Sequence, residues 1–238
     1  MKSPEELLTR AMNALAEKLK GKLVLKGGML LRRYQSPRST QDVDFVLLTK
    51  ESKKKWGSPI VKTLEGSGIK VSKIELNSRG IFIDIEDETG DQKAQVEVDV
   101  RISTHLRPEP MTTATLSKKY KMGGRVISAM AVPEAFSNKI AAALERRAVR
   151  DLYDLSQLET MGAFDVKTLE ERFSRLTVER GKPRKVSVKE GARMLRERLE
   201  DLDQKKIEQD LHPLLPIEFR PGVLGVIWAS VSRIAQRM

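Results

Sequence analysis

The spacing of apolar residues changes along this chain, and that change constrains the fold more than any other feature. In the first half, short apolar segments with the period-two alternation of strands are mixed with helical stretches, whereas from about residue 165 every long segment has helical spacing. Sustained helical spacing begins after Pro133 and Glu134. We therefore expect an α+β fold, with a mixed-sheet domain over residues 1–130 and an α-helical domain over residues 131–238.

Composition excludes several classes of protein. The chain has 238 residues, of which 39% are hydrophobic and none is cysteine, so it can bury a sizeable core but cannot be a disulfide scaffold or bind a metal through cysteine. No apolar run approaches the ~20 residues that cross a bilayer, and the N-terminus lacks the apolar region of a signal peptide. We expect a cytoplasmic protein without membrane contact, and the net charge of +11 favours a partner that carries phosphates.

A glycine pair follows the first predicted strand. The strand covers residues 23–25, Gly27 and Gly28 follow it, and a short helix is expected over residues 29–34. Backbone N–H groups at such a strand-to-helix turn can approach a triphosphate closely. By itself, however, a Gly-Gly pair is most often an ordinary turn.

Two aspartates come shortly after the glycines. Asp42 and Asp44 alternate with Val43 and Phe45, so a strand over residues 42–48 places both carboxylates on one face. Paired carboxylates of this kind can hold a hard divalent cation through their oxygens. An isolated acidic pair is more often solvated surface. This pair indicates a functional site because it follows the glycine pair at a short separation in the sequence.

The same patterns predict the other elements of the first half. They are a surface helix over 51–66 that is interrupted near Ser58 and Pro59, strands over 69–76, 80–86 and 95–100, a loop region over 103–124, and a short strand near Val126 and Ile127. Two of these strands display an acid that alternates with apolar residues, Asp84 in one and Asp99 in the other. From alternation alone, either acid could be a third carboxylate.

Several segments resemble a known family. Leu25–Arg32 and Arg38–Phe45 resemble the first motif of the polymerase-β-like nucleotidyltransferase superfamily. Lys139–Arg147 and Arg150–Leu155 are similar to two later motifs of its AbiEii/AbiGii toxin branch, which includes the MenT toxins. The resemblance covers about residues 22–160, and the order of the motifs along the chain is that of the family.

The resemblance implies a polymerase-β-like catalytic domain, with helices that complete the active-site cleft. It implies metal-dependent transfer of a nucleoside monophosphate from a nucleoside triphosphate (NTP), for some members to the 3′ end of tRNA, by a toxin that a cognate antitoxin controls. Asp42 and Asp44 would be the ligands of Mg²⁺, with Mn²⁺ as an alternative, and the backbone of Gly27 and Gly28 would hold the triphosphate. Many members have Gly-Ser at this pair, so a hydroxyl contact is missing here.

The resemblance also assigns roles to residues farther along the chain. Asp99 matches the third carboxylate better than Asp84 does, because Asp99 lies on the last strand before the helical half. Lys139 matches the lysine that contacts the nucleotide phosphates, and Asp154 would position that lysine or the nucleotide. Asp151 lies one helical turn before Asp154 and could equally cap its helix.

Basic residues are concentrated between residues 171 and 198. They are Arg172, Arg175, Arg180, Lys182, Arg184, Lys185, Lys189, Arg193, Arg196 and Arg198. This run predicts contacts with RNA phosphates, which the family resemblance implies are those of tRNA, or else a solvated helical face. An aromatic content of 5% argues against stacking on unpaired bases. The alternatives to transfer onto tRNA are transfer to a protein or small-molecule hydroxyl, or a non-catalytic RNA-binding module. No motif marks the preferred NTP.

Overall fold

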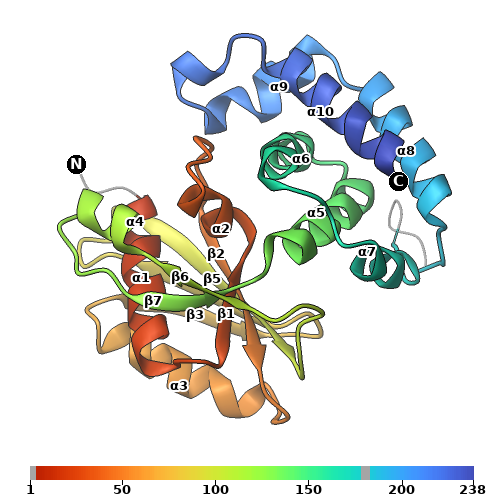
Figure 1. The fold of residues 1–238 in the computed structure, drawn as a ribbon. Coiled ribbons are helices and arrows are strands. Elements are labelled where there is room, and N and C mark those ends of the chain that lie inside the picture. The colour runs from red at the N-terminus through yellow and green to blue at the C-terminus, as the bar shows by residue number, and fades with distance from the viewer. Residues whose placement is uncertain (1–3, 178–182) are drawn as a thin grey trace. The chain divides into compact units, whose positions relative to one another are not determined.

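The computed structural model describes residues 4–177 and 183–238. The chain folds into two compact units (Figure 1). The first, here called the sheet unit, contains the described residues up to Gln35 together with Ser39–Ala131. The second, here called the helical unit, contains Val132–Met238 together with the short segment Ser36–Arg38. That segment lies in the part of the chain that sequence analysis assigned to the first domain.

The sheet unit contains a mixed sheet of seven strands in the order β3-β4-β5-β2-β1-β7-β6. The strands are β1 (Leu23–Lys26), β2 (Asp42–Leu48), β3 (Lys70–Leu76), β4 (Ile81–Glu86), β5 (Lys93–Arg101), β6 (Glu109–Thr112) and β7 (Val126–Ala129). Strand β2 is parallel to β5 and β1 is parallel to β7, whereas the other neighbouring strands are antiparallel. The central strand β2 therefore has one parallel and one antiparallel neighbour.

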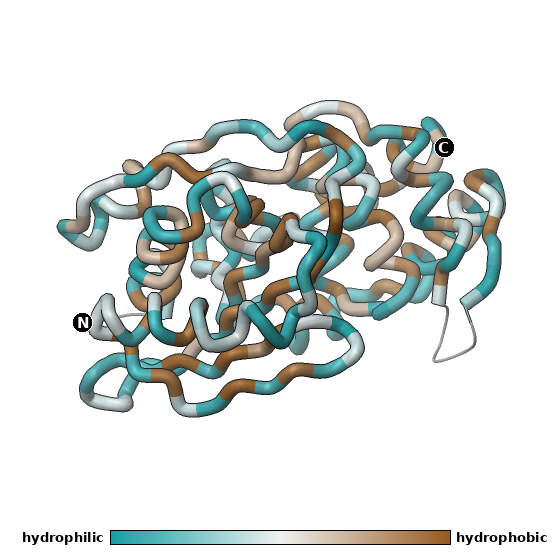
Figure 2. Tube along the Cα trace, turned by 90° about the horizontal axis from the view of Figure 1, so that it is seen from below, coloured by the Kyte–Doolittle hydropathy of each residue, from teal (hydrophilic) through white to brown (hydrophobic). Residues whose placement is uncertain are grey.

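Helices cover one face of this sheet. The unit contains α1 (Pro4–Lys18), α2 (Gly27–Arg33), α3 (Lys54–Glu65) and α4 (Ala114–Lys119). Helix α1 packs against β2, β5 and β7, and α3 packs against α1 and β3. Val43, Phe45 and Leu47 of β2 are fully buried, as period-two alternation requires for strand residues on the core face. Hydrophobic and hydrophilic residues alternate along parts of the trace in Figure 2. Because the buried positions of β2 and β5 alternate with half-buried polar ones, their polar residues lie on the opposite face of the sheet.

The helical unit consists of helices and short 3₁₀ turns. The helices are α5 (Val132–Arg146), α6 (Val149–Met161), α7 (Val166–Phe173), α8 (Val188–Glu200), α9 (Gln204–Asp210) and α10 (Val223–Arg237), with 3₁₀ turns at His212–Leu214 and Ile217–Phe219. Helix α5 packs against α6 and α7, and α10 packs against α6 and α8. Asp165, Ser187 and Asp203 cap the N-termini of α7, α8 and α9 by accepting backbone N–H bonds. In the described part of the chain, every helix is too short or too polar to span a bilayer.

The mixed sheet followed by helices confirms the predicted α+β class, but two local predictions are wrong. Residues 103–124 are not simply a loop, because they include β6 and α4. Both elements are too short to show a period, and tertiary contacts hold them, since the side chain of Asn13 in α1 hydrogen-bonds Thr113 at 2.7 Å and Ser117 at 2.9 Å.

The second wrong prediction is the interruption of the helix near Pro59. Helix α3 continues through Pro59, although proline lacks the N–H that would bond to the carbonyl four residues earlier. That carbonyl belongs to Lys55, and both Lys55 and Pro59 are exposed, so water can satisfy the freed group.

Candidate active site

Carboxylates gather on the polar face of the sheet unit. Asp42 and Asp44 alternate along β2, and the parallel register places Glu97 of β5 directly opposite Asp44. Paired residues on neighbouring strands point to the same face, and the strands are ~4.8 Å apart. Asp99 lies on the same face of β5 but opposite Val46, one pleat farther along. Glu97, which sequence analysis did not select, is therefore the acid on β5 that lies opposite the aspartate pair.

The environment of Glu97 raises the pKa of its carboxyl from 4.5 to about 7. Burial is the largest cause, repulsion by Asp44, then Asp42 and finally Asp99 adds to it, and Lys26 offsets part of the effect. Glu97 is thus a half-buried carboxyl among like charges.

Asp99 and Asp84, the two predicted candidates for a third carboxylate, both have polar partners. Asp99 accepts bonds from Nζ of Lys26 at 2.9 Å and from Nη2 of Arg101 at 3.2 Å. Asp84 lies on β4, one strand beyond β5, and its Oδ1 accepts a bond from Nε2 of Gln95 at 2.7 Å. Asp99 thus borders the group of carboxylates with its charge balanced by two cations, and Asp84 lies farther from β2.

The absence of a side chain at Gly27 leaves room for the Asp44 carboxylate. Gly27 has φ +68°, and a Cβ built on it would lie 1.9 Å from Oδ2 of Asp44. Both the backbone conformation and the close approach therefore require glycine here. Asp42 is oriented separately, because the hydroxyl of Thr40 donates to its Oδ1.

Arg32, one turn beyond the glycines, is engaged elsewhere in the sheet unit. Its Nε donates to Oε1 of Glu5 at 2.5 Å, and the other oxygen of Glu5 accepts bonds from Lys119 and Tyr120. Burial raises the pKa of Glu5, but Lys119, Tyr120 and Arg32 outweigh burial and lower it. This network joins α1, α2 and α4. The contact of Arg32 with Glu5 therefore stabilises the packing of these helices.

The helical unit holds a second group of charged side chains. Nζ of Lys139 on α5 lies 2.9 Å from Oδ2 of Asp154 and 3.2 Å from Oδ1 of Asp151, both on α6. Asp154 also accepts bonds from Nε and Nη2 of Arg38 at 2.8 and 3.0 Å. Asp151 also pairs with Arg146, whose Nη2 lies 2.9 Å from Oδ1. The helix cap proposed for Asp151 is therefore wrong, because its side chain is buried between two cations and the N-cap residue of α6 is Ala148.

The partners of this group keep it charged. Burial lowers the pKa of Lys139, but the carboxylates of Asp154 and Asp151 outweigh burial and raise it. Burial likewise raises the pKa of Asp154, and Lys139 and Arg38 outweigh it, so the pKa falls below its ordinary value. Sequence analysis missed Arg38, because no periodic pattern shows that a loop arginine will pair with an acid on a distant helix.

The carboxylates of the sheet unit can be compared with the ligands that the implied divalent cation requires. Within residues 4–177 and 183–238, no three acidic or histidine side chains converge closely enough to form a complete metal site. Mg²⁺ is commonly held by one or two carboxylates, with water and substrate phosphates as the other ligands. Asp42 and Asp44, with Glu97 opposite Asp44 on the neighbouring strand, could supply the one or two carboxylates of such a partial site.

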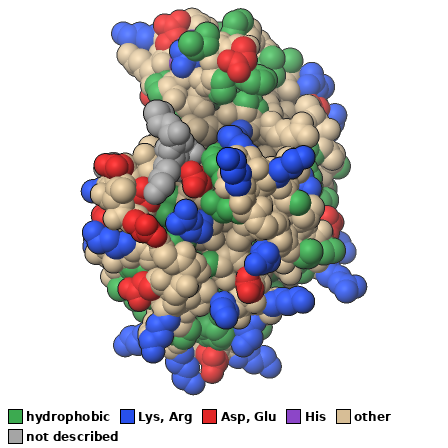
Figure 3. Space-filling model, turned by 90° about the vertical axis from the view of Figure 1, so that its left-hand side faces the viewer, with side chains coloured by type: hydrophobic (Ala, Val, Ile, Leu, Met, Phe, Trp, Pro, Cys, Tyr) green, Lys and Arg blue, Asp and Glu red, His purple; other side chains and the backbone are tan. Residues whose placement is uncertain are grey.

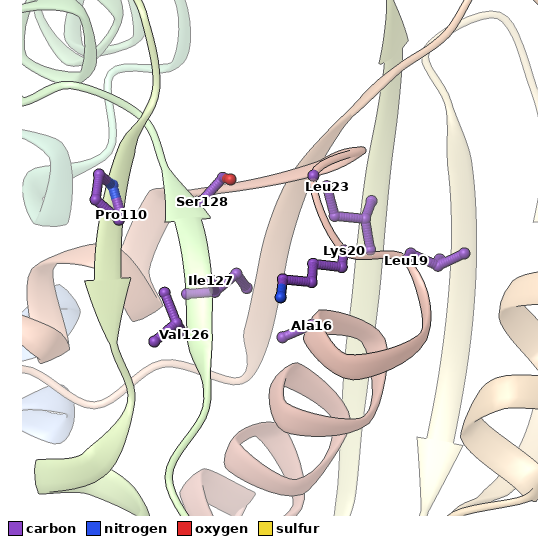
Figure 4. A pocket seen from close by; sticks show the side chains of 9 residues that line it. Ala16, Leu19, Lys20, Leu23, Pro110, Val126, Ile127 and Ser128 are labelled. Carbon is purple, nitrogen blue, oxygen red and sulfur yellow. The ribbon is translucent and has the colours of Figure 1, made fainter.

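A small cavity in the sheet unit lies among other residues. It has a volume of about 150 Å³ and is formed by the end of α1 and the turn after it together with β6 and β7. Figure 4 shows the Lys20 side chain extending toward Ile127 of β7. Ligand pockets typically have volumes of ~300–1,000 Å³, so this mostly apolar cavity is too small for a nucleotide.

Part of the basic run between residues 171 and 198 is already engaged within the helical unit. Arg172 pairs with Glu145, Arg184 with Glu190 and Arg193 with Glu197. Arg198 is buried and donates to the carbonyl of Ala143. Arg196 is exposed but donates to the carbonyl of Ala235 at 2.9 Å, and Arg175, Lys185 and Lys189 are exposed. Arg180 and Lys182 lie outside the described residues. On the face of the molecule shown in Figure 3, basic and acidic side chains are interspersed.

Solved structures with the same architecture include nucleotidyltransferases. MenT4, a nucleotidyltransferase toxin of Mycobacterium tuberculosis, aligns with a TM-score of 0.59 at 18% identity over 95% of this chain and 93% of that one. A putative nucleotidyltransferase of Helicobacter pylori aligns with a TM-score of 0.53 at 15% identity over 98% and 95% of the two chains. JHP933 of the same species aligns with a TM-score of 0.53 at 16% identity over 98% and 92%. The fold is therefore that of a nucleotidyltransferase.

The sequence itself defines the family. Residues 10–224 match the family described as "Nucleotidyl transferase AbiEii toxin, Type IV TA system", whereas no curated protein matches. The chain belongs to the AbiEii family and is a nucleotidyltransferase toxin of a type IV toxin–antitoxin system, which confirms the predicted family.

Replacing Gly27 by alanine should destabilise the protein more than the same change at Gly21. Both glycines have positive φ, but a Cβ at Gly21 meets nothing within 4 Å, whereas at Gly27 it collides with Asp44. We expect Gly21→Ala to lose ~1 kcal/mol of unfolding free energy and Gly27→Ala ~3 kcal/mol or more, measured by urea denaturation. Equal losses would contradict the close approach of Asp44.

In metal-free buffer, Glu97→Gln should change the pH dependence of stability. The folded carboxyl has a pKa of about 7 against 4.5 for the ordinary group, so its contribution to stability is complete below pH 4.5 and is lost as the pH rises through 7. Relative to wild type, Glu97→Gln should gain ~1–2 kcal/mol between pH 5 and pH 8, after allowance for solvent screening. Urea denaturation in EDTA measures this difference, and Asp84→Asn is the control that should not reproduce it.

Proposed function

We propose that this toxin transfers a nucleoside monophosphate from an NTP to the 3′ end of tRNA in a reaction that depends on Mg²⁺ or Mn²⁺. The observation that carries the proposal is the register of β2 and β5, which places Glu97 opposite Asp44 and raises the pKa of Glu97 to about 7. A divalent cation would relieve the repulsion among these carboxylates. Family membership supports the transfer reaction and a cognate antitoxin.

In this proposal, Asp42, Asp44 and Glu97 would hold the metal. When bound, the metal would stabilise charge on the reacting phosphate and favour deprotonation of the acceptor hydroxyl. We assign the third carboxylate to Glu97 rather than Asp99, because Glu97 lies opposite Asp44 and Asp99 is paired with Lys26 and Arg101. Asp99 would instead hold the Lys26 ammonium beside the carboxylates, where it limits their repulsion.

Backbone and side-chain groups would hold the nucleotide. The backbone N–H groups of Gly27 and Gly28 would contact the triphosphate, and the Lys139 ammonium would bind the departing pyrophosphate. Asp154 would position Lys139 through their 2.9 Å ion pair.

The acceptor is the least constrained part of the proposal. Exposed Arg175, Lys185, Lys189 and Arg196 on the helical unit favour a polyanion over a small molecule. Nucleotides added to the 3′ end of tRNA would block aminoacylation, which would account for toxicity. A protein or small-molecule hydroxyl is the alternative, because the same carboxylates would serve either acceptor.

Asp42→Ala and Asp44→Ala should each reduce transfer at least ~100-fold without loss of the fold, because removal of a carboxylate also removes repulsion. The assay incubates the protein with total tRNA, Mg²⁺ and each α-³²P-labelled NTP in turn, and resolves the RNA on a denaturing gel. Glu65→Ala, an exposed acid on α3, is the control and should retain wild-type transfer.

Each outcome of this assay has a distinct meaning. Label that enters RNA with wild type, but not with either aspartate variant, supports both the site and the acceptor. Near-wild-type transfer by Asp42→Ala or Asp44→Ala would refute the site. If wild type binds Mg²⁺ and NTP but labels no RNA, tRNA is not the acceptor.

A further inference from the structure

Arg146, at the C-terminal end of α5, is partly exposed yet held in one orientation. Its Nε and Nη2 donate to the two oxygens of Asp151 at 3.2 and 2.9 Å, which is the two-bond geometry of an arginine–carboxylate fork. The side chain of Asp151 is 1% exposed, whereas that of Arg146 is 53% exposed. A buried acid thus fixes a guanidinium that faces solvent.

The same carboxylate also fixes Lys139. Oδ1 of Asp151 accepts from Nζ of Lys139 at 3.2 Å and from Nη2 of Arg146 at 2.9 Å. Because both nitrogens bond to one oxygen, they are separated by no more than two hydrogen-bond lengths, ~6 Å. Asp151 therefore determines the positions of two neighbouring cations.

Positive charge exceeds negative charge in this group. Three cations, Arg38, Lys139 and Arg146, surround two carboxylates, Asp151 and Asp154. A further cation, Arg198, is close enough for Asp151 to affect its pKa, which burial and then repulsion by Arg147 lower. An anion would be favoured beside this group, most strongly at the exposed side of Arg146.

We propose that Arg146 and Lys139 together bind the terminal phosphates of the NTP, and that Asp151 is the positioning residue for both. This inference rests on the proposed function, which already assigns Lys139, and adds Arg146 as a phosphate ligand and Asp151 as its positioning residue. Arg146 has five N–H donors and Asp151 uses two of them, so the remaining edge can bind phosphate oxygens. Lys139 is 13% exposed, so a narrow terminal phosphate can reach it more readily than an RNA backbone can.

The test measures binding of a non-hydrolysable NTP analogue, with Mg²⁺, to the full chain by isothermal titration calorimetry. We expect Arg146→Ala to weaken binding of the analogue ~10–100-fold and to leave binding of the corresponding monophosphate unchanged, because only the terminal phosphates contact Arg146. Arg146→Lys should give an intermediate loss, since it keeps the charge without the fork. Arg150→Ala, an exposed arginine four residues later, is the matched control and should bind within about twofold of wild type.

Asp151→Asn separates positioning from simple charge. If Asp151 only contributed negative charge, its neutralisation would strengthen binding of an anion. If Asp151 positions the two cations, Asp151→Asn should weaken binding of the analogue by at least ~10-fold. Thermal unfolding of each variant is measured in parallel, and the half-exposed Arg146 variants keep the test valid if Asp151→Asn does not fold.

The outcomes distinguish this inference from the proposed function. If wild type binds the analogue and Arg146→Ala binds it equally well, the role of Arg146 is refuted while the proposed function stands. Equal weakening for the triphosphate and the monophosphate would also refute contact with the terminal phosphates. If wild type does not bind the analogue with Mg²⁺, both the proposed function and this inference fail.

Discussion

Repulsion among the carboxylates of β2 and β5 is the constraint on which the rest of the site depends. The parallel register that places Glu97 opposite Asp44 brings like charges together at a half-buried position. Neighbouring features accommodate them: Gly27 leaves space for the Asp44 carboxylate, and Lys26 balances Asp99. Glu97 nevertheless keeps a raised pKa, and this residual repulsion is the electrostatic reason for proposing a divalent cation there.

The helical unit has the opposite imbalance of charge. Arg38, Lys139 and Arg146 exceed the two aspartates that hold them, although every ion pair within this group is well formed. A divalent cation would be favoured beside the carboxylate group, and a phosphate beside the cationic group. Both are chemical groups of a nucleotidyl-transfer reaction, the activity that the family assignment gives.

The sequence predicted the features that depend on local pattern. The alternation around Asp42 and Asp44 identified the acidic face of β2, and the change to helical spacing identified the fold class. Glu97 was missed because Glu97 and Asp99 share one face of β5, and only the tertiary register decides which lies opposite Asp44. Arg38 was missed for a related reason, since an ion pair between distant elements leaves no periodic signal in the sequence. Arg146 pairs with Asp151 across the turn between α5 and α6, and such a turn also interrupts the helical period.

The central claim is that Asp42, Asp44 and Glu97 bind a divalent cation. Titration of Mn²⁺ into wild type, Glu97→Gln and Asp99→Asn, in the presence of a non-hydrolysable NTP and followed by electron paramagnetic resonance, tests it most directly. The account predicts that wild type and Asp99→Asn retain Mn²⁺ and that Glu97→Gln binds it at least ~10-fold more weakly. Loss of Mn²⁺ from Asp99→Asn, with wild-type binding by Glu97→Gln, would contradict it.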